Sequence, residues 1–223
     1  KTMHSTNTTS VGASVPENFE LTPVKKERRA DTRLLAQHLG NQHETVMRLV
    51  NDYRADFEQF GILRFQVGEI QGRGQPEKYA LLNEDQAYLL LTYSRNSAKV
   101  RALKVKMVKA FAEVRRAAEV RQMEYLPAYH QLHDAIKVAA NGSPNERFIH
   151  MNANKALNQL AGVESGQRAG AGSLQQSILA VGSALAAQAL QNATDGHGLH
   201  KRIKSALEPL TGILALPEVH HEN

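Results

Sequence analysis

Apolar residues recur at helical spacing in two short segments of residues 31–53, which only a few residues separate. In the first segment, Leu34, Leu35, Ala36 and Leu39 form one apolar face, and Gly40 follows them. Glycine commonly ends a helix because it adopts the left-handed conformation without strain. The pattern therefore predicts a helix that ends at Gly40.

The second segment predicts another helix, which begins at once. Val46, Leu49, Val50 and Tyr53 recur at intervals of three and four residues, and Glu44 has the capping-box spacing from Asn41, the expected cap. The residues expected on the opposite side, away from the apolar stripe, are Asn41, Glu44, Thr45, Arg48 and Asn51. Arginine and asparagine can recognise guanine and adenine edges in the major groove. The pair of helices thus has the spacing of a helix-turn-helix, although such corners also occur in helical domains that bind no nucleic acid.

The spacing changes from helical to strand-like after residue 61. Leu63, Phe65 and Val67 alternate with polar residues, a turn-rich segment follows over 71–77, and residues 78–82 predict the returning strand. Two helices followed by a hairpin have the order of a winged helix. Arg73, between two glycines at the hairpin tip, is either a minor-groove contact or an ordinary solvated arginine.

Residues 98–123 predict one long helix. Val100, Leu103, Met107, Phe111 and Val114 are spaced three and four apart, as in a coiled-coil seam. Residues 99–121 contain eight basic and two acidic side chains, and no acid lies within 99–109. The basic side chains are either a solvated face or phosphate contacts.

The remaining residues predict a helical module. Helices are expected over 127–140, from about 146 to 161, over 173–190 and over 199–210, with a glycine-rich linker at 162–172. The fold class expected is mainly α with a small β-hairpin: a flexible arm (1–29), a winged helix-turn-helix with its long basic helix (30–123), a helical oligomerisation or partner-binding domain (124–215) and a tail (216–223). Residues 25–29, KKERR, are expected either as a solvated stretch or as phosphate contacts, and Met3 as the native start.

Composition and charge limit the classes of protein to which the chain can belong. The 223 residues are 42% apolar and carry a formal net charge of +5, which is compatible with a polyanionic partner. The chain contains no cysteine, so disulfides and thiol chemistry are excluded. No segment approaches a membrane span and the first residues lack the apolar core of a signal peptide, so a cytoplasmic protein is expected.

No catalytic, metal or cofactor site is expected. His130 with His133, and His197 with His200, lack the spacing of a zinc motif, and the glycines of 162–172 lack the residues of a phosphate-binding loop. No motif brings together a nucleophile, a base and an oxyanion donor. We therefore expect a protein that is not an enzyme and needs no cofactor.

Residues 32 to about 117 resemble the Rha family of phage regulatory proteins. The likeness is carried by LLAQHLGNQHETVMRLV, PEKYALLNEDQAYLLLTYS and RNSAKVRALKVKMVKAFAEVR, and the three blocks occur in the same order. Residues 124–191, especially GSPNERFIHMNANKALNQLAGVESGQRA, resemble the carboxy-terminal module of some phage regulators and antirepressors. The resemblance implies a phage or prophage regulator, and supplies no catalytic residue.

The function expected is control of phage genes by binding double-stranded DNA; the alternative is an antirepressor that binds a phage repressor protein. The candidate DNA-contacting residues are Asn41, Gln42, His43, Thr45, Arg48, Asn51, Arg73, Lys99, Arg101, Lys104 and Lys106. A homo-oligomer, most simply a dimer, is also expected, held by the carboxy-terminal helices around Gly182 and in addition by the seam from Val100 to Val114; the alternative is a compact monomeric bundle.

Overall fold

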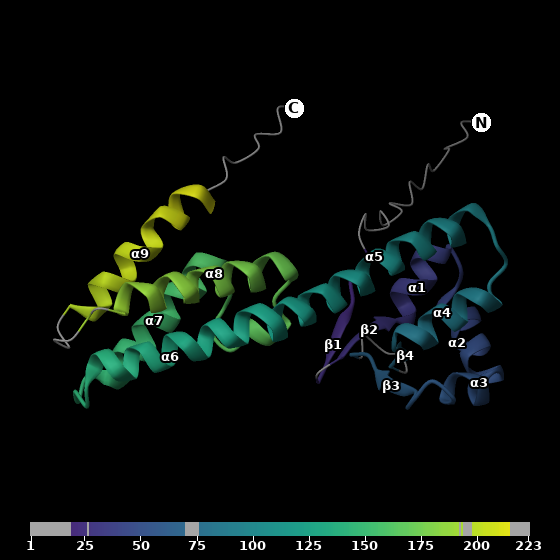
Figure 1. The fold of residues 1–223 in the computed structure, drawn as a ribbon. Coiled ribbons are helices and arrows are strands. Elements are labelled where there is room, and N and C mark those ends of the chain that lie inside the picture. Colours follow the sequence, from purple (N-terminus) through teal and green to yellow (C-terminus); the bar gives the residue numbers. More distant parts are fainter. Residues whose placement is uncertain (1–18, 26, 70–75, 192, 194–197, 215–223) are drawn as a thin grey trace, which may run out of the picture. The chain divides into compact units, whose positions relative to one another are not determined.

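The computed structural model describes residues 19–25, 27–69, 76–191, 193 and 198–214. The chain divides into two compact units, residues 1–111 and 112–223. Helix α5 (Ala98–Val120) crosses the boundary, which therefore lies inside the long basic helix and not at its end near residue 123. The mainly helical fold with a small antiparallel sheet agrees with the fold class that the sequence predicts (Figure 1).

The amino-terminal unit contains a small sheet and short helices. Their order is β1 (Thr22–Val24), β2 (Glu27–Asp31), α1 (Thr32–Leu39), α2 (His43–Asp52), α3 (Arg54–Glu58), β3 (Arg64–Val67), β4 (Lys78–Leu82), α4 (Glu84–Tyr93) and the first half of α5. The strand order in the sheet is β1-β2-β4-β3, with every pair antiparallel. The alternating pattern predicted this hairpin, in which Arg64 pairs with Leu81 and Val67 with Lys78.

The sheet begins earlier in the chain than the sequence suggested. Residues 1–29 were expected to form an arm, but β1 and most of β2 precede residue 30, and the side chain of Phe19 is buried. Strand β1 is an edge strand of this sheet. The expected native start, Met3, lies outside the described residues.

The turn between α1 and α2 is fixed by backbone hydrogen bonds. Gly40 has φ +69°, and its N–H and that of Asn41 donate to carbonyl oxygens of the last turn of α1. This arrangement satisfies carbonyls that would otherwise lack a partner at the helix end. Asn41 was expected to cap α2, but the cap position is held by Gln42 and no side chain bonds there.

The core of the amino-terminal unit uses the seam of α5. Val100, Leu103, Met107 and Phe111 are buried together with residues of α1, α2, β4 and α4. The buried side of α2 consists of Val46, Met47 and Val50, while Tyr53, which was expected in the buried stripe, is 47% exposed just beyond the helix end. Val67 of β3 is likewise exposed, against the expected alternation.

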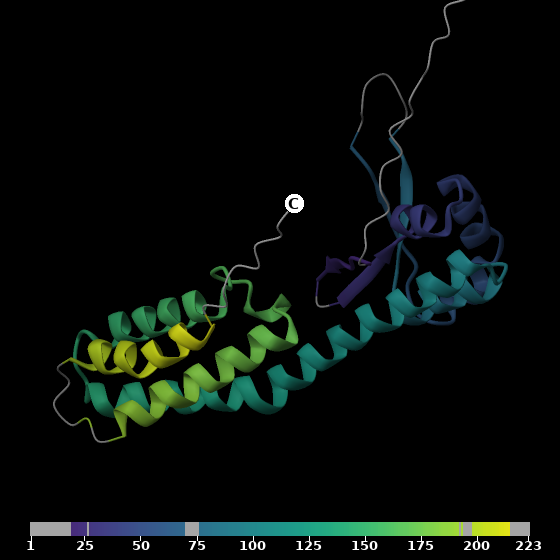
Figure 2. The same ribbon diagram turned by 90° about the horizontal axis from the view of Figure 1, so that it is seen from above.

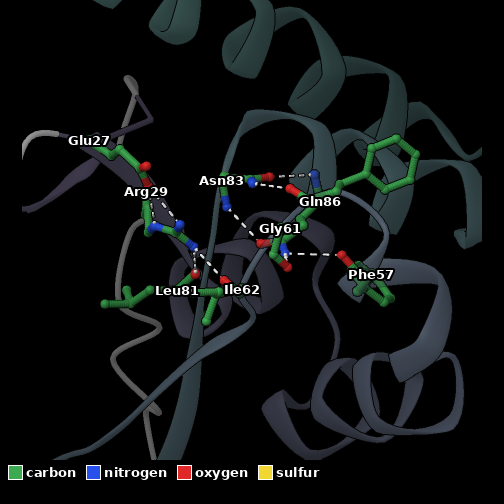
Figure 3. A network of polar contacts seen from close by, with 9 residues as sticks. Glu27, Arg29, Phe57, Gly61, Ile62, Leu81, Asn83 and Gln86 are labelled. Carbon is green, nitrogen blue, oxygen red and sulfur yellow. Dashed lines mark hydrogen bonds and ion pairs between the residues drawn. The ribbon is translucent and has the colours of Figure 1, made fainter.

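Two buried polar side chains fix the loop between α3 and β3 (Figure 3). Arg29 donates from Nη1 to the carbonyl oxygens of Ile62 and Leu81 and forms an ion pair with Glu27. Gln86 donates to the carbonyl oxygens of Phe57 and Gly61. These bonds satisfy backbone groups that the sheet and helices leave unpaired.

The carboxy-terminal unit is a bundle of helices. Its elements are the second half of α5, a π-helical turn η1 (Arg121–Tyr125), α6 (Leu126–Ala140), α7 (Glu146–Ala161), a 3-10 turn η2 (Arg168–Gly170), α8 (Ser173–Leu190) and α9 (Leu199–Leu214). Helix α8 packs against α6, α7 and α9, as Figures 1 and 2 show. The close approach expected at Gly182 is present, because a β-carbon there would lie 2.8 Å from Leu157 Cδ2.

Two helices contain a proline. Pro127 was expected to open a helix, and it lies in the first turn of α6, directly after the π-helical turn. Pro209 lies inside α9, which continues to Leu214 beyond the expected end at residue 210. The buried residues of α9, Leu199, Ile203 and Leu207, all precede Pro209.

Candidate nucleic-acid interface

Helix α2 exposes one polar side. Asn41, Gln42, Thr45, Arg48 and Asn51 are exposed, opposite the buried Val46 and Val50. Side chains on the outer side of a short helix are the ones that can enter a major groove. Asn41, Glu44, Thr45, Arg48 and Asn51 were predicted to face away from the apolar stripe, and all five are exposed.

The side chain of Lys99 lies at the turn that leads into α2. A β-carbon added to Gly40 would lie 2.7 Å from Lys99 Nζ, so the amine lies directly over the turn. Lys99 belongs to α5, which is distant in sequence from the two helices. The ammonium group thus lies at the carboxy-terminal end of α1, in the turn that leads into α2, where it could contact a phosphate of bound DNA.

A surface groove of about 400 Å³ runs between α2 and the α4–α5 connection. Asn41, Thr45 and Arg48 line it from α2, and Arg95 and Ser97 line it from the connection. Arg95 was not among the candidates, although an arginine in the short break SRNS was a signal that could have been used. The groove places two guanidinium-bearing side chains along one edge of the candidate recognition helix.

His43, the first residue of α2, also holds neighbouring elements together through its two ring nitrogens. Its Nδ1 lies 2.5 Å from Glu77 Oε1, and its Nε2 lies 3.0 Å from Thr32 Oγ1. Thr32 Oγ1 also accepts a hydrogen bond from the backbone N–H of Ala80. The ring therefore links α1, α2 and β4, and both nitrogens have partners within the unit, so it is not free to bind a base.

One face of the hairpin carries a stacked arginine. The Arg33 guanidinium lies 3.5 Å from the ring centroid of Tyr79, and the Tyr79 hydroxyl donates to Gln66 Oε1. Arg33 also pairs with Asp31, and this hydrogen bond raises the pKa of Arg33. Arg33 stays charged over the whole physiological range and connects α1 to the root of the hairpin. The tip, including the candidate Arg73, lies outside the described residues.

The basic residues of α5 do not form a single face. Around the helix, Lys99 and Lys106 lie on one side of the buried seam, and Arg101 and Lys104 lie on the other. Lys106 is close to His38, where burial and this positive charge lower the pKa of the imidazole. Arg101 donates to the backbone oxygen of Asn96. Of the four candidates, Lys99 alone is tied by the structure to the turn before α2.

Not every basic residue of the stretch before α1 can contact a phosphate, which was one of the two interpretations of residues 25–29. Arg29 is only 3% exposed and its guanidinium is bonded within the unit, so it cannot reach a phosphate. Arg28 donates to the backbone oxygen of Leu21. The basic cluster therefore contains a buried arginine that stabilises the fold as well as solvated side chains.

In the carboxy-terminal unit, two histidines stack. The rings of His133 and His150 are 4.3 Å apart, and the ring of Tyr129 also lies 4.3 Å from that of His133; His197 lies outside the described residues. Burial and the positive surroundings, chiefly His150, lower the pKa of His133. Within the described ranges, no three histidine, aspartate or glutamate side chains are grouped so that they could hold a metal ion.

Arg168 is the main polar anchor of that unit. Its guanidinium donates to Tyr125 Oη and Asn158 Oδ1, and also to the side chain and backbone oxygens of Asn154. The backbone oxygen of Arg168 accepts from the buried Gln176. This arginine fixes the loop before α8 and has no role in the candidate interface. Among the described helices, none is long and apolar enough to cross a membrane.

Comparison with known proteins gives one match. Residues 30–116 match the family model described as phage regulatory protein Rha. This segment contains α1, α2, the described part of the hairpin and the basic half of α5. No curated protein and no solved structure gave a significant match.

Proposed function

Because residues 30–116 carry the domain of the Rha family of phage regulatory proteins, we propose that this phage regulator binds double-stranded DNA through α1 and α2, with the β3–β4 hairpin as a wing. The order of helix, helix and hairpin is that of a winged helix-turn-helix. We also propose that it acts in the cytoplasm of the bacterial host and has no enzymatic role.

The exposed side of α2 is the observation that carries the proposal. Arg48 and Asn51 point away from the core, and neither is tied to another side chain by a hydrogen bond or ion pair in the described structure. Arginine can pair bidentately with guanine and asparagine with adenine. Thr45 and Asn41 extend the same surface toward the start of the helix.

Positive side chains flank that helix where backbone phosphates would lie. Lys99 lies over the turn before α2, and Arg95 lines the groove beside it. Phosphate contacts fix the register of a protein on the duplex, while base contacts supply sequence preference. The proposed roles are therefore phosphate binding for Lys99 and Arg95 and base recognition for Arg48 and Asn51.

A second candidate function is binding of a phage repressor protein. The exposed apolar side chains of the amino-terminal unit favour it: Ile62 is 72% exposed, and Tyr53, Phe60 and Val67 are exposed as well. Apolar side chains of this kind are typical of protein contacts rather than of contacts with phosphates. In this alternative, the same unit would act as an antirepressor.

Selection from a library of random DNA duplexes tests the proposal. The full chain is expected to enrich a defined duplex sequence that contains guanine and adenine at neighbouring positions. Enrichment of no sequence over repeated rounds at low salt would contradict base recognition. A repressor protein that binds the chain after nuclease treatment, combined with no enriched duplex, would favour the antirepressor.

A further inference from the structure

His43 is the middle member of a chain of hydrogen bonds. Its Nδ1 lies 2.5 Å from Glu77 Oε1, and a carboxylate only accepts hydrogen bonds, so Nδ1 carries a proton. In the neutral ring, Nε2 then accepts a hydrogen bond from the Thr32 hydroxyl, 3.0 Å away. The same hydroxyl oxygen accepts from the backbone N–H of Ala80, also at 3.0 Å. The chain therefore starts at β4, passes through α1 and α2, and ends at Glu77, the residue directly before β4.

Burial indicates that this chain of hydrogen bonds holds elements together and does not react. A hydroxyl, an imidazole and a carboxylate in this order also occur in hydrolases, where the hydroxyl attacks a bound substrate. Thr32 is 0% exposed, so a substrate cannot reach its oxygen. What the chain of bonds fixes is the position of Glu77 relative to the start of α2.

Glu77 belongs to the part of the hairpin that extends beyond the rest of the sheet. In the pairing of the described residues, β2 reaches β4 at Leu81 and Leu82 only, and the residues of β4 closer to the tip pair with β3 alone. The backbone oxygen of Glu77 accepts from the N–H of Gly68, which continues the pairing of β3 and β4. The direction of this outer part therefore depends on side-chain contacts with the helices.

Arg33 of α1 supplies one such contact and His43 of α2 another. Arg33 stacks on Tyr79, with 3.5 Å between the guanidinium carbon and the ring centroid. This stack fixes the hairpin against α1 and not against the candidate recognition helix. Among the hydrogen bonds and ion pairs of the described residues, the one between His43 and Glu77 joins α2 itself to the hairpin.

We propose that His43 is a positioning residue, which through Glu77 fixes the hairpin relative to α2 so that both elements fit one DNA duplex in a single register. This inference rests on the proposed DNA binding, and it gives a part in that binding to a side chain that contacts no base. Without the contact, the hairpin would be in place in only a fraction of the molecules, and the apparent affinity would fall by that fraction. The sequence preference would survive, since the base contacts of α2 supply it.

Glu77→Ala tests the inference by the sign of its effect. The Glu77 side chain is 53% exposed, so its truncation leaves no buried cavity. Removing a carboxylate from a DNA-binding surface would by charge alone strengthen binding. The loss of positioning predicts the opposite, a decrease of about five- to tenfold in affinity for the selected duplex, which is the size of one hydrogen bond. Glu77→Gln keeps an oxygen that can accept from Nδ1 and is expected to restore the wild-type affinity.

Glu69→Ala is the matched control. Glu69 is an exposed carboxylate of the same hairpin, beside Gly68, and has no hydrogen bond or ion pair with the described residues. This variant is expected to bind the selected duplex as tightly as the wild type or more tightly. His43→Ala should weaken binding as Glu77→Ala does, and combining the two should add little, because both remove the same contact.

Hydrogen exchange of the free protein tests the positioning without DNA. The amide of Gly68, which donates to Glu77 within the hairpin, is expected to exchange faster in Glu77→Ala than in the wild type and in Glu77→Gln. Equal exchange in all three, or a Glu77→Ala variant that binds the duplex as tightly as Glu69→Ala, would overturn the inference. A wild-type chain that binds no duplex would instead contradict the proposed function, and the exchange rates would then decide alone whether His43 holds the hairpin in place.

Discussion

Arginines of the amino-terminal unit fall into two kinds that the sequence does not distinguish. The Arg29 guanidinium is buried and bonded to the carbonyl oxygens of Ile62 and Leu81. Arg48 is exposed on α2. The buried Arg29 stabilises the fold, whereas the exposed Arg48 is available to a ligand.

Arg48→Ala and Asn51→Ala should each weaken binding to the selected duplex without changing the fold. Both side chains are exposed, and a lost bidentate base contact costs about 1–3 kcal/mol. Gel-shift titration with the selected and a scrambled duplex measures the effect. Glu58→Ala, on the exposed side of α3, is the control. Unchanged affinity in both variants would show that α2 does not read the bases.

Arg29→Met should lower the free energy of unfolding and leave DNA binding by the folded protein unchanged. The substitution leaves two buried carbonyl oxygens without their donor, at a cost of about 1–3 kcal/mol. Urea unfolding followed by circular dichroism measures the change. A variant of wild-type stability with a large loss of DNA affinity would mean that Arg29 reaches phosphate after all.

The exposed face of α2 could be predicted from the sequence, because it depends only on helical periodicity. The role of His43 could not, since it depends on contacts with Thr32 and with Glu77 across the hairpin. Arg29 was expected in a solvated or phosphate-binding stretch, because the sequence does not show its contacts with the carbonyl oxygens of Ile62 and Leu81. Lys99 was identified as a basic residue, but its position over the turn follows from the packing of α5.

Helix α5 has two roles, with an apolar seam buried in the amino-terminal core and basic residues on either side of it. Neutralising Lys99, Arg101 and Lys104 together to glutamine should weaken binding to all duplexes about equally. Phosphate contacts carry no sequence information, so the sequence preference should survive. Affinity for selected and scrambled duplexes, measured by fluorescence anisotropy, tests this.

Lys99→Gln alone should account for the largest part of that loss, because its amine lies over the turn that leads into α2. Lys109→Gln, which changes an exposed lysine of the same helix, is the matched control. If the triple variant binds both duplexes like the wild type, the basic side chains are only solvated.

His133 of α6 makes the free energy of unfolding depend on pH. The pKa of His133 is lowered by burial and by the neighbouring His150, so the unfolded chain binds a proton more readily than the folded one. Stability should be complete above about pH 6.5, the ordinary histidine pKa, and should fall as the pH drops below it. Asp134 opposes the effect, while His130 and Arg168 add to it.

His133→Asn should reduce this loss of stability on acidification. Thermal unfolding midpoints on either side of about pH 6.5 measure it. Gln131→Asn, at an exposed position of α6, controls for a substitution in the helix. Equal loss in the variant and the wild type would assign the acid sensitivity to other groups.

Most helices could be predicted from apolar spacing and caps; α1, for example, ends at Gly40 as expected. The short α3 and the π-helical turn were not predicted, because each depends on tertiary contacts more than on a local pattern. Helix α6 begins next to Pro127 as expected, whereas α9 continues past its expected end at residue 210.

For the chain as a whole, the two units have separate cores. The amino-terminal unit carries the exposed side of α2 and the adjoining basic residues. The carboxy-terminal unit has its own core and its own polar anchor, Arg168. The boundary inside α5 was not predicted, because the basic helix continues through it without a break in pattern.

The affinity of the full chain for its selected duplex, measured over a series of salt concentrations, tests the proposed DNA binding most directly. The logarithm of the binding constant should fall linearly with the logarithm of the salt concentration, by about 0.9 for each phosphate contacted. The selected duplex should stay preferred over a scrambled one throughout. Binding that is insensitive to salt and shows no preference between the two duplexes would contradict DNA recognition by this protein.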